Sequence, residues 1–209
     1  MIKLDLKKDL KRFYAPSAKR VELVDLPEWT FLMIDGAIEP GTGPGTSPGF
    51  QEAIQAVYGA AYTLKFALKL REAEPVDYPV MPLEGLWWVE DGHFDIREPG
   101  NWKYTLMILQ PDVITSEQFN QAVARLSQKK PSPALDRLRL AKFQEGLCIQ
   151  TLHLGPYASE PDTVAKMHAF AGDQGLAQQG KHHEIYLGNP LRADASKLKT
   201  ILRLPVARV

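Results

Sequence analysis

Two glutamates stand inside runs that otherwise have the composition of β-strands. Glu184 lies in the run His182–Leu187 (HHEIYL), and Glu84 lies in the run Met81–Trp88 (MPLEGLWW). Glutamate is depleted in strand interiors because an ionised carboxylate is costly to remove from water. The two runs fall at matching places in the two halves of the chain. This match indicates a site built from both halves.

The alternation of side chains along a strand decides which neighbours each glutamate has. In the later run, His182, Glu184 and Tyr186 share one face, and in the earlier run Glu84 shares a face with Trp88. Placed about a pseudo-twofold axis, these faces would line one groove with two carboxylates and several rings. Such a groove fits a planar small molecule that is apolar or cationic, because rings stack on it and a carboxylate attracts positive charge.

A desolvated glutamate can also act as a general acid or base. Burial raises the pKa of a carboxyl group, so either glutamate could exchange a proton near neutral pH. A tyrosine within reach could donate a hydrogen bond to charge that develops on a ligand oxygen. The tyrosines considered for this role are Tyr58, Tyr62, Tyr104 and Tyr157.

Structural roles compete for the same residues. A glutamate in a strand can protect a sheet edge or pair with a nearby Arg or Lys. Trp87 and Trp88 are adjacent and must point to opposite sides of a strand, so at least one of them belongs to the core. Tyr58 and Tyr62 lie one helical turn apart, a spacing that core packing also explains.

A metal site is a further alternative. His182 and Glu184 could both reach an ion in the groove, with His153 as a third ligand. No His-Glu-x-x-His spacing supports a metal, and no Gly-x-Ser-x-Gly elbow indicates a serine nucleophile. We therefore expect neither a metal nor another cofactor.

The elements that must position these residues begin with one strand, one helix and two strands. A strand is expected over residues 29–38, followed by a Pro- and Gly-rich loop over 40–49. Apolar residues at helical spacing predict a helix over 50–72. Two strands are then expected over 80–89 and 103–109. A helix capped by Thr115 or Ser116 connects this unit to the rest of the chain.

The same order recurs in the second half. Strand 147–154 is followed by helix 160–175 and by strands 183–187 and 201–206. The predicted fold class is therefore α+β, a duplicated strand-helix-strand-strand unit with pseudo-twofold symmetry and a ligand groove between two lobes.

We expect one domain over residues 1–209. Lobe one is placed at about 21–112, the connecting helix at about 115–130 and lobe two at about 135–209.

Composition argues against charged macromolecular partners. Lys+Arg and Asp+Glu both number 25, so no excess of positive charge favours nucleic acid or an anionic membrane surface. No apolar run approaches the roughly 18 residues of a membrane span, and no signal-peptide pattern opens the chain. The expected compartment is the cytoplasm, and the oligomeric state is not indicated.

Several runs together resemble the GyrI-like small-molecule-binding superfamily, the fold of effector-binding domains in AraC- and MerR-type regulators. They span nearly the whole chain: FLMIDGAIEPG, AIQAVYGAAYTLKFALK, MPLEGLWW, WKYTLMILQP, EGLCIQTLHLGPYASEP, HHEIYLGNP and LKTILRLPV. The resemblance is greatest to a stand-alone branch that has no helix-turn-helix domain.

The resemblance implies a ligand groove between duplicated halves, with the family's recurring acidic residue falling on Glu184. It also implies, for some stand-alone members, hydrolysis of cyclopropanoid genotoxins of the duocarmycin and yatakemycin type. For this reaction Glu184 is the expected base and Tyr58 the expected hydrogen-bond donor. The expected walls and other substrate contacts are Glu84, Trp87, Trp88, Trp102, Tyr104, Tyr62, His153, Tyr157, His182 and Tyr186. The alternative function is a binder that sequesters or senses hydrophobic drugs without catalysis.

Overall fold

The strands and helices follow one another along the whole chain. The computed structural model describes residues 1–92, 94–188 and 193–209. Its strands are β1 (Ile2–Lys3), β2 (Glu22–Ala37), β3 (Val76–Asp77), β4 (Leu83–Trp88), β5 (Lys103–Leu109), β6 (Arg139–Leu154), β7 (Leu176–Gln178), β8 (His182–Tyr186) and β9 (Lys199–Arg208). Its helices are α1 (Leu6–Asp9), α2 (Lys11–Tyr14), α3 (Pro48–Lys69), α4 (Ser116–Lys129) and α5 (Glu160–Asp173).

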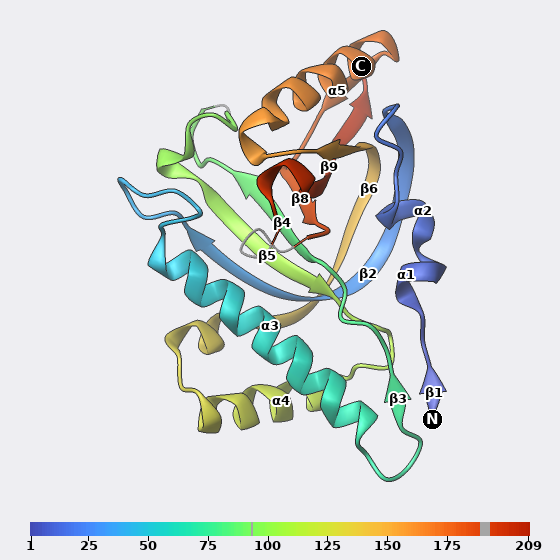
Figure 1. Ribbon diagram of the computed structural model, residues 1–209, viewed down its shortest axis with the longest axis vertical. Helices are drawn as coiled ribbons and strands as arrows, with labels where there is room; N and C mark the ends of the chain where they lie inside the picture. Colours follow the sequence, from blue (N-terminus) through green and yellow to red (C-terminus); the bar gives the residue numbers. More distant parts are fainter. Residues whose placement is uncertain (93, 189–192) are drawn as a thin grey trace.

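The long strands close into a ring. Within the described residues, the order β6-β2-β5-β4-β8-β9 is closed by a second pairing of β6 with β9, which makes a six-stranded antiparallel barrel. Strand β7 pairs with β9 outside the ring. The curvature of β2 and β6 that closure requires is visible in Figure 1. Closure leaves these strands without the unpaired edges that invite aggregation.

The two halves of the chain use the same pairing scheme. In the first half β5 pairs with both β2 and β4, and in the second half β9 pairs with both β6 and β8. The halves join through β4–β8 and β2–β6. The predicted α+β class is confirmed, and the repeated pairing is the topology expected of the duplicated unit.

Strands β2 and β6 are much longer than the sequence indicates. Apolar residues predict strands only from about 29 and 147, whereas β2 begins at Glu22 and β6 at Arg139. The added segments carry exposed polar residues such as Asp25 and Lys142, which hide the strand pattern. They form strands because β2 and β6 pair with each other, from Glu22 opposite Gln150 to Met33 opposite Arg139.

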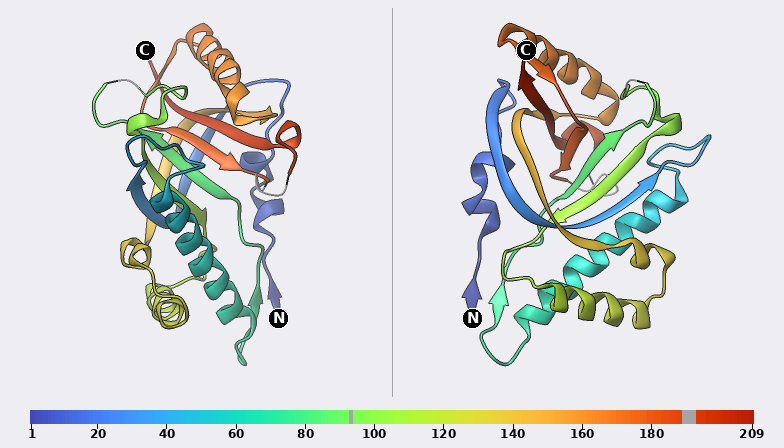
Figure 2. Two further views of the ribbon diagram at one scale, coloured as in Figure 1. Left: turned by 60° about the vertical axis from the view of Figure 1, so that its left-hand side comes forward. Right: turned by 180° about the vertical axis from the view of Figure 1, so that it is seen from behind.

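Two helices cover the outer face of the barrel. Helix α3 begins with Ser47 as N-cap and Pro48 in its first turn, and it buries small and apolar residues such as Ala60 and Leu64 in the main core. Helix α5 packs Met167 onto Ile149 of β6, in a second cluster. Figure 2 shows α3 and α5 toward opposite ends of the strand array. No helix among the described residues is long and apolar enough to cross a membrane.

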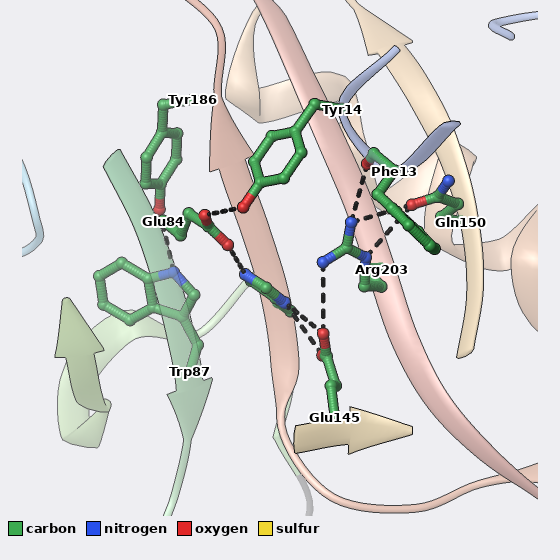
Figure 3. Close-up of polar contacts among 9 residues, drawn as sticks. Phe13, Tyr14, Glu84, Trp87, Glu145, Gln150, Tyr186 and Arg203 are labelled. Atoms are coloured by element: carbon green, nitrogen blue, oxygen red, sulfur yellow. Dashed lines mark hydrogen bonds and ion pairs between the residues drawn. The ribbon is translucent and has the colours of Figure 1, made fainter. Parts of the chain in front are cut away.

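The inside of the barrel holds a network of buried charges (Figure 3). The Tyr14 hydroxyl donates to Oε1 of Glu84 at 2.6 Å, and Nε2 of His183 lies 3.0 Å from Oε2 of the same carboxylate. The other ring nitrogen of His183 lies 2.9 Å from both oxygens of Glu145. Because both nitrogens face carboxylates, both must donate, which requires the imidazolium form.

Arg203 extends the network to the N-terminal segment. Its guanidinium donates to Glu145 at 3.3 Å, to the Gln150 side chain at 3.0 and 3.2 Å and to the Phe13 carbonyl at 2.9 Å. Glu145 and Gln150 both reach the interior because β6 bends at Gly146, where φ is 74°. Two carboxylates are thus matched by one imidazolium and one guanidinium, as buried charges require.

The charges shift one another's pKa. Burial lowers the pKa of His183, but the Glu145 charge and the hydrogen bonds to Glu145 and Glu84 outweigh burial and raise it. Burial alone would raise the pKa of Glu145. The charges and hydrogen bonds of His183 and Arg203 outweigh burial, so the pKa of Glu145 is lowered. Because the pKa of His183 is higher in the folded protein than in the unfolded chain, protonation of His183 stabilises the fold. This stabilisation is fully present below the unfolded-state pKa, and it is lost as the pH rises through the folded-state pKa.

We predict that His183→Gln lowers the free energy of unfolding by about 3–5 kcal/mol below pH 6.5, because it leaves buried carboxylates without their cation. The loss should shrink as pH rises above the raised pKa of His183, where the wild-type ring is also neutral. Urea unfolding across pH measures the difference, with Lys166→Gln at an exposed position of α5 as control. A penalty that stays constant with pH would contradict the imidazolium assignment.

Candidate functional site

Glu184 lies in the middle of β8, on the outer face of the barrel between the regions covered by α3 and α5. Its partner across the strand pair is Gly85 of β4. A Cβ atom at Gly85 would lie 2.8 Å from Nε1 of Trp87 and 3.1 Å from the Tyr186 hydroxyl. The absence of a side chain at Gly85 therefore leaves the space in which Trp87 and Tyr186 meet beside Glu184.

The neighbours of Glu184 on its own face hold it in place. Nε2 of His182 lies 3.1 Å from Oε1 of Glu184. The Trp87 indole donates to the Tyr186 hydroxyl at 3.0 Å (Figure 3). Burial, the charge of Glu184 and a hydrogen bond with Glu184 raise the pKa of Tyr186 well above its usual value, so that hydroxyl keeps its proton.

A second carboxylate accompanies Glu184, and it is Glu160 in the first turn of α5. Glu160 is 1% exposed, and its burial together with the charge of Glu184 raises its pKa to about 9. With its pKa raised to about 9, Glu160 is protonated at neutral pH.

A buried hydroxyl lies against this second carboxylate. It belongs to Thr200, the β9 residue paired with Tyr186. A hydrogen bond with Thr200 lowers the pKa of Glu160, against the larger opposing effects of burial and of the Glu184 charge. The carboxyl group of Glu160 is therefore held in place between β8 and β9.

Aromatic rings surround the carboxylates on the β4 side. Phe94 stacks on His182 with ring centroids 5.5 Å apart, and it also contacts Trp102. Trp102 packs edge-on against Trp87 at 5.4 Å. Tyr104 lies behind Trp87, only 1% exposed. Trp87 and Trp102 thus form one wall, and Tyr104 supports it from the core.

Tyrosines stand on the other sides of Glu184. Tyr157 meets the Tyr186 ring edge-on with centroids 6.0 Å apart, and its burial and the charges of Glu184 and Glu160 raise its pKa to about 12. On α3, Tyr58 is half-buried and forms a hydrogen bond with the backbone of Leu83. Leu83 is the β4 residue that pairs with Tyr186 of β8. Tyr62 stacks on Tyr58 at 6.3 Å and is 47% exposed.

The register of β4 and β8 separates Glu84 and Trp88 from Glu184. Glu84 pairs with Ile185 and Glu184 with Gly85, so the two glutamates are on opposite faces of the barrel wall. The expectation that both line one groove is wrong, because Glu84 is enclosed in the interior network. Trp88 also points to the inner face, where Nζ of Lys181 lies 3.3 Å from its ring centroid.

His153 supports the loop before α5. Its Nδ1 lies 2.8 Å from the Thr163 hydroxyl, and its Nε2 lies 3.2 Å from the Ser159 hydroxyl and from the Pro156 carbonyl. These contacts order the turn that carries Tyr157 and Glu160. No group of three His, Cys, Asp or Glu side chains within the described ranges is placed to hold a metal.

Glu160 is the site residue that sequence reasoning missed. An acidic residue at the start of a helix is common and is usually solvated, since it interacts favourably with the helix N-terminus. Only the fold buries Glu160 beside another carboxylate. The nearest sequence signal is its place in the GPYASEP run that carries the family resemblance.

Comparison with known proteins identifies the family. The sequence profile of the GyrI-like small molecule binding domain matches residues 19–207. The chain belongs to the GyrI-like family. Its fold matches that of an uncharacterized conserved protein from Listeria innocua at 42% identity and a TM-score of 0.88, with 98% of this chain and 100% of that chain covered.

Two further relatives of known structure, from the same organism, are each described as a hydrolase. One is 40% identical with a TM-score of 0.85 and the other 38% identical with a TM-score of 0.82, and both comparisons cover 98% of this chain and 100% of the relative. The EcmrR C-terminal domain shares the fold at 11% identity and a TM-score of 0.54, over 91% of this chain and 98% of that chain. No match was found among the curated proteins.

We predict that Glu184→Gln lowers the pKa of Glu160 from about 9 towards the usual range, because the substitution removes the charge that disfavours ionisation of Glu160. Carboxyl-carbon NMR titration of glutamate-labelled protein measures this pKa. The exposed substitution Glu90→Gln is the control and should leave the titration of Glu160 unchanged. An unchanged titration in Glu184→Gln would show that the two carboxylates do not interact.

Proposed function

We propose that the region around Glu184 binds flat hydrophobic small molecules and hydrolyses activated cyclopropanes of the duocarmycin and yatakemycin type. The observation that carries this proposal is the pair of buried carboxyl groups, Glu184 and Glu160, beside aromatic walls. Membership in a small-molecule-binding family and the hydrolases among the relatives support it.

The binding surface suits a flat apolar body. Trp87 and Trp102 form one side, and Tyr157, Tyr186 and Tyr58 stand on the others. Glu184 is only 6% exposed, so a ligand that touches its carboxylate has to displace a covering ring. Tyr157 suits such a movement because it is 37% exposed and lies on the short turn before α5.

The pair of carboxylates suits the addition of water to a strained ring. Glu184 takes a proton from water while the water oxygen bonds to a cyclopropane carbon. The carbon–carbon bond breaks, and its electrons pass into the conjugated carbonyl, whose oxygen becomes a phenolate. Tyr58 donates a hydrogen bond to that oxygen, and Glu160 supplies the proton it finally takes. Proton transfer from Glu184 to Glu160 restores the starting state.

We predict that Glu184→Gln lowers the turnover number of ring opening about a hundredfold or more, the usual cost of losing a general base. The assay incubates a duocarmycin-type cyclopropane with enzyme and follows the product heavier by one water by mass spectrometry. Glu90→Gln serves as the matched control. Tyr58→Phe should lower turnover by about tenfold to a hundredfold while leaving the fold intact.

Tight binding of the cyclopropane by the wild-type protein without a hydrated product would overturn the hydrolase. It would instead identify a protein that sequesters hydrophobic compounds. A charged Glu184 among aromatic rings also suits hydrophobic cations in that role, since rings and a carboxylate both attract positive charge.

We also predict that turnover falls as pH rises through about 9. Above this pH Glu160 is ionised, so it cannot supply a proton, and its charge opposes the negative charge that develops on the phenolate oxygen. A profile of turnover against pH measures this limb. Turnover that stays constant well above the pKa of Glu160 would show that Glu160 takes no part in the reaction.

A further inference from the structure

A separate cavity opens at the mouth of the barrel, on the face of β4 opposite to Glu184. Its volume is about 310 Å³, and it is lined by inner-face residues of β2, β4, β5 and β6 together with Lys181 just before β8. This volume is at the small end of the range for ligand pockets, about 300–1,000 Å³. The function proposed for Glu184 does not account for the cavity, because the barrel wall separates them.

The walls of the cavity are largely apolar. Met33 of β2 and Leu86 of β4 line it, together with Ala141 and Phe143 of β6. Phe143 is held edge-on against Phe31 with ring centroids 6.2 Å apart. Apolar walls of this kind favour a ligand with an apolar body.

The rim of the cavity carries an unmatched positive charge. Arg139 pairs with Asp35 at 2.7 Å, and Lys142 pairs with Glu28 at 2.9 Å. Lys181 forms no ion pair with a described residue. Its ammonium instead lies over the Trp88 ring.

A bound anion would give Lys181 the ion-pair partner that it lacks among the described residues. Burial lowers the pKa of Lys181, and the nearby Arg139 charge lowers it further, against the opposing effect of Asp35. A bound negative charge beside the ammonium would offset both effects. Because the ammonium already covers this face of Trp88, the body of a ligand bound to Lys181 lies against the apolar wall instead.

The charged side chains at the floor of the cavity are already paired with one another. They are His183, Glu84 and Glu145, which lie deeper in the barrel on the same strands as the cavity residues. His183 contacts both glutamates. The charge of a ligand is therefore recognised at the rim, while its body lies against Met33 and Leu86.

We propose that the mouth of the barrel is a second ligand site, which binds a small aromatic carboxylate with its carboxylate on Lys181 and its ring against the apolar wall. This ligand class differs from that of the Glu184 region, where a charged carboxylate repels anions.

Isothermal titration calorimetry with 2-naphthoate, and with the neutral 2-naphthamide for comparison, tests the site on the full chain. Wild-type protein should bind 2-naphthoate about tenfold more tightly than the amide, the effect of one partly buried charge pair. Lys181→Gln should remove this preference and leave the affinity for the amide unchanged. Lys166→Gln, at an exposed lysine of α5, is the matched control.

A second variant, Ala141→Trp, fills the cavity and should abolish binding of both compounds while far-ultraviolet circular dichroism stays that of the wild type. Glu184→Gln should leave the affinity for 2-naphthoate unchanged. Three results would each overturn the proposal: no binding of 2-naphthoate to the wild type, equal affinity for the acid and the amide, or binding that responds to Glu184→Gln but not to Lys181→Gln.

Discussion

The antiparallel register of β4 and β8 is the constraint on which the rest of the structure depends. It places Glu184 opposite Gly85 on the outer face, and it places Glu84 and His183 on the inner face. A slip of one residue would exchange the faces, leaving buried charges without partners and moving the apolar side chains out of the core. The strand pair that carries the candidate chemistry is thus also the one that the interior network holds in register.

Adjacent residues of β8 use buried charge in two different ways. On the inner face, His183 joins two carboxylates that Tyr14 and Arg203 also satisfy, which is a stabilising arrangement with no capacity left over. On the outer face, Glu184 lies beside a second buried carboxyl group, Glu160, whose pKa the charge of Glu184 raises. A like-charged neighbour in a buried position costs stability, whereas the inner network stabilises the fold. The contrast separates a structural glutamate, Glu84, from the candidate functional one, Glu184.

The order of the main strands and helices could be predicted from the sequence, because the local signals within these elements are strong. Residues 103–109 form β5 as predicted, and α4 is capped by Thr115, one of the two expected N-caps. The polar halves of β2 and β6 could not be predicted, because only pairing with a distant strand makes them extended. The side of the sheet on which Glu84 lies could not be predicted either. Alternation within a strand shows which residues share a face, but it does not show how that strand is aligned with its neighbour. Glu160 was missed because its burial depends on where α5 docks on the barrel.

The contacts of Arg203 also bear on how the chain is made. Its guanidinium on β9 binds the carbonyl of Phe13, and β9 closes the ring by pairing with both β6 and β8. During synthesis, every other strand of the ring leaves the ribosome before β9. Until β9 emerges, β6 and β8 each have an open edge, and Glu145 lacks one of its two cationic partners. The barrel therefore closes only after β9 has been synthesised, and until then the open edges of β6 and β8 are exposed to pairing with other chains.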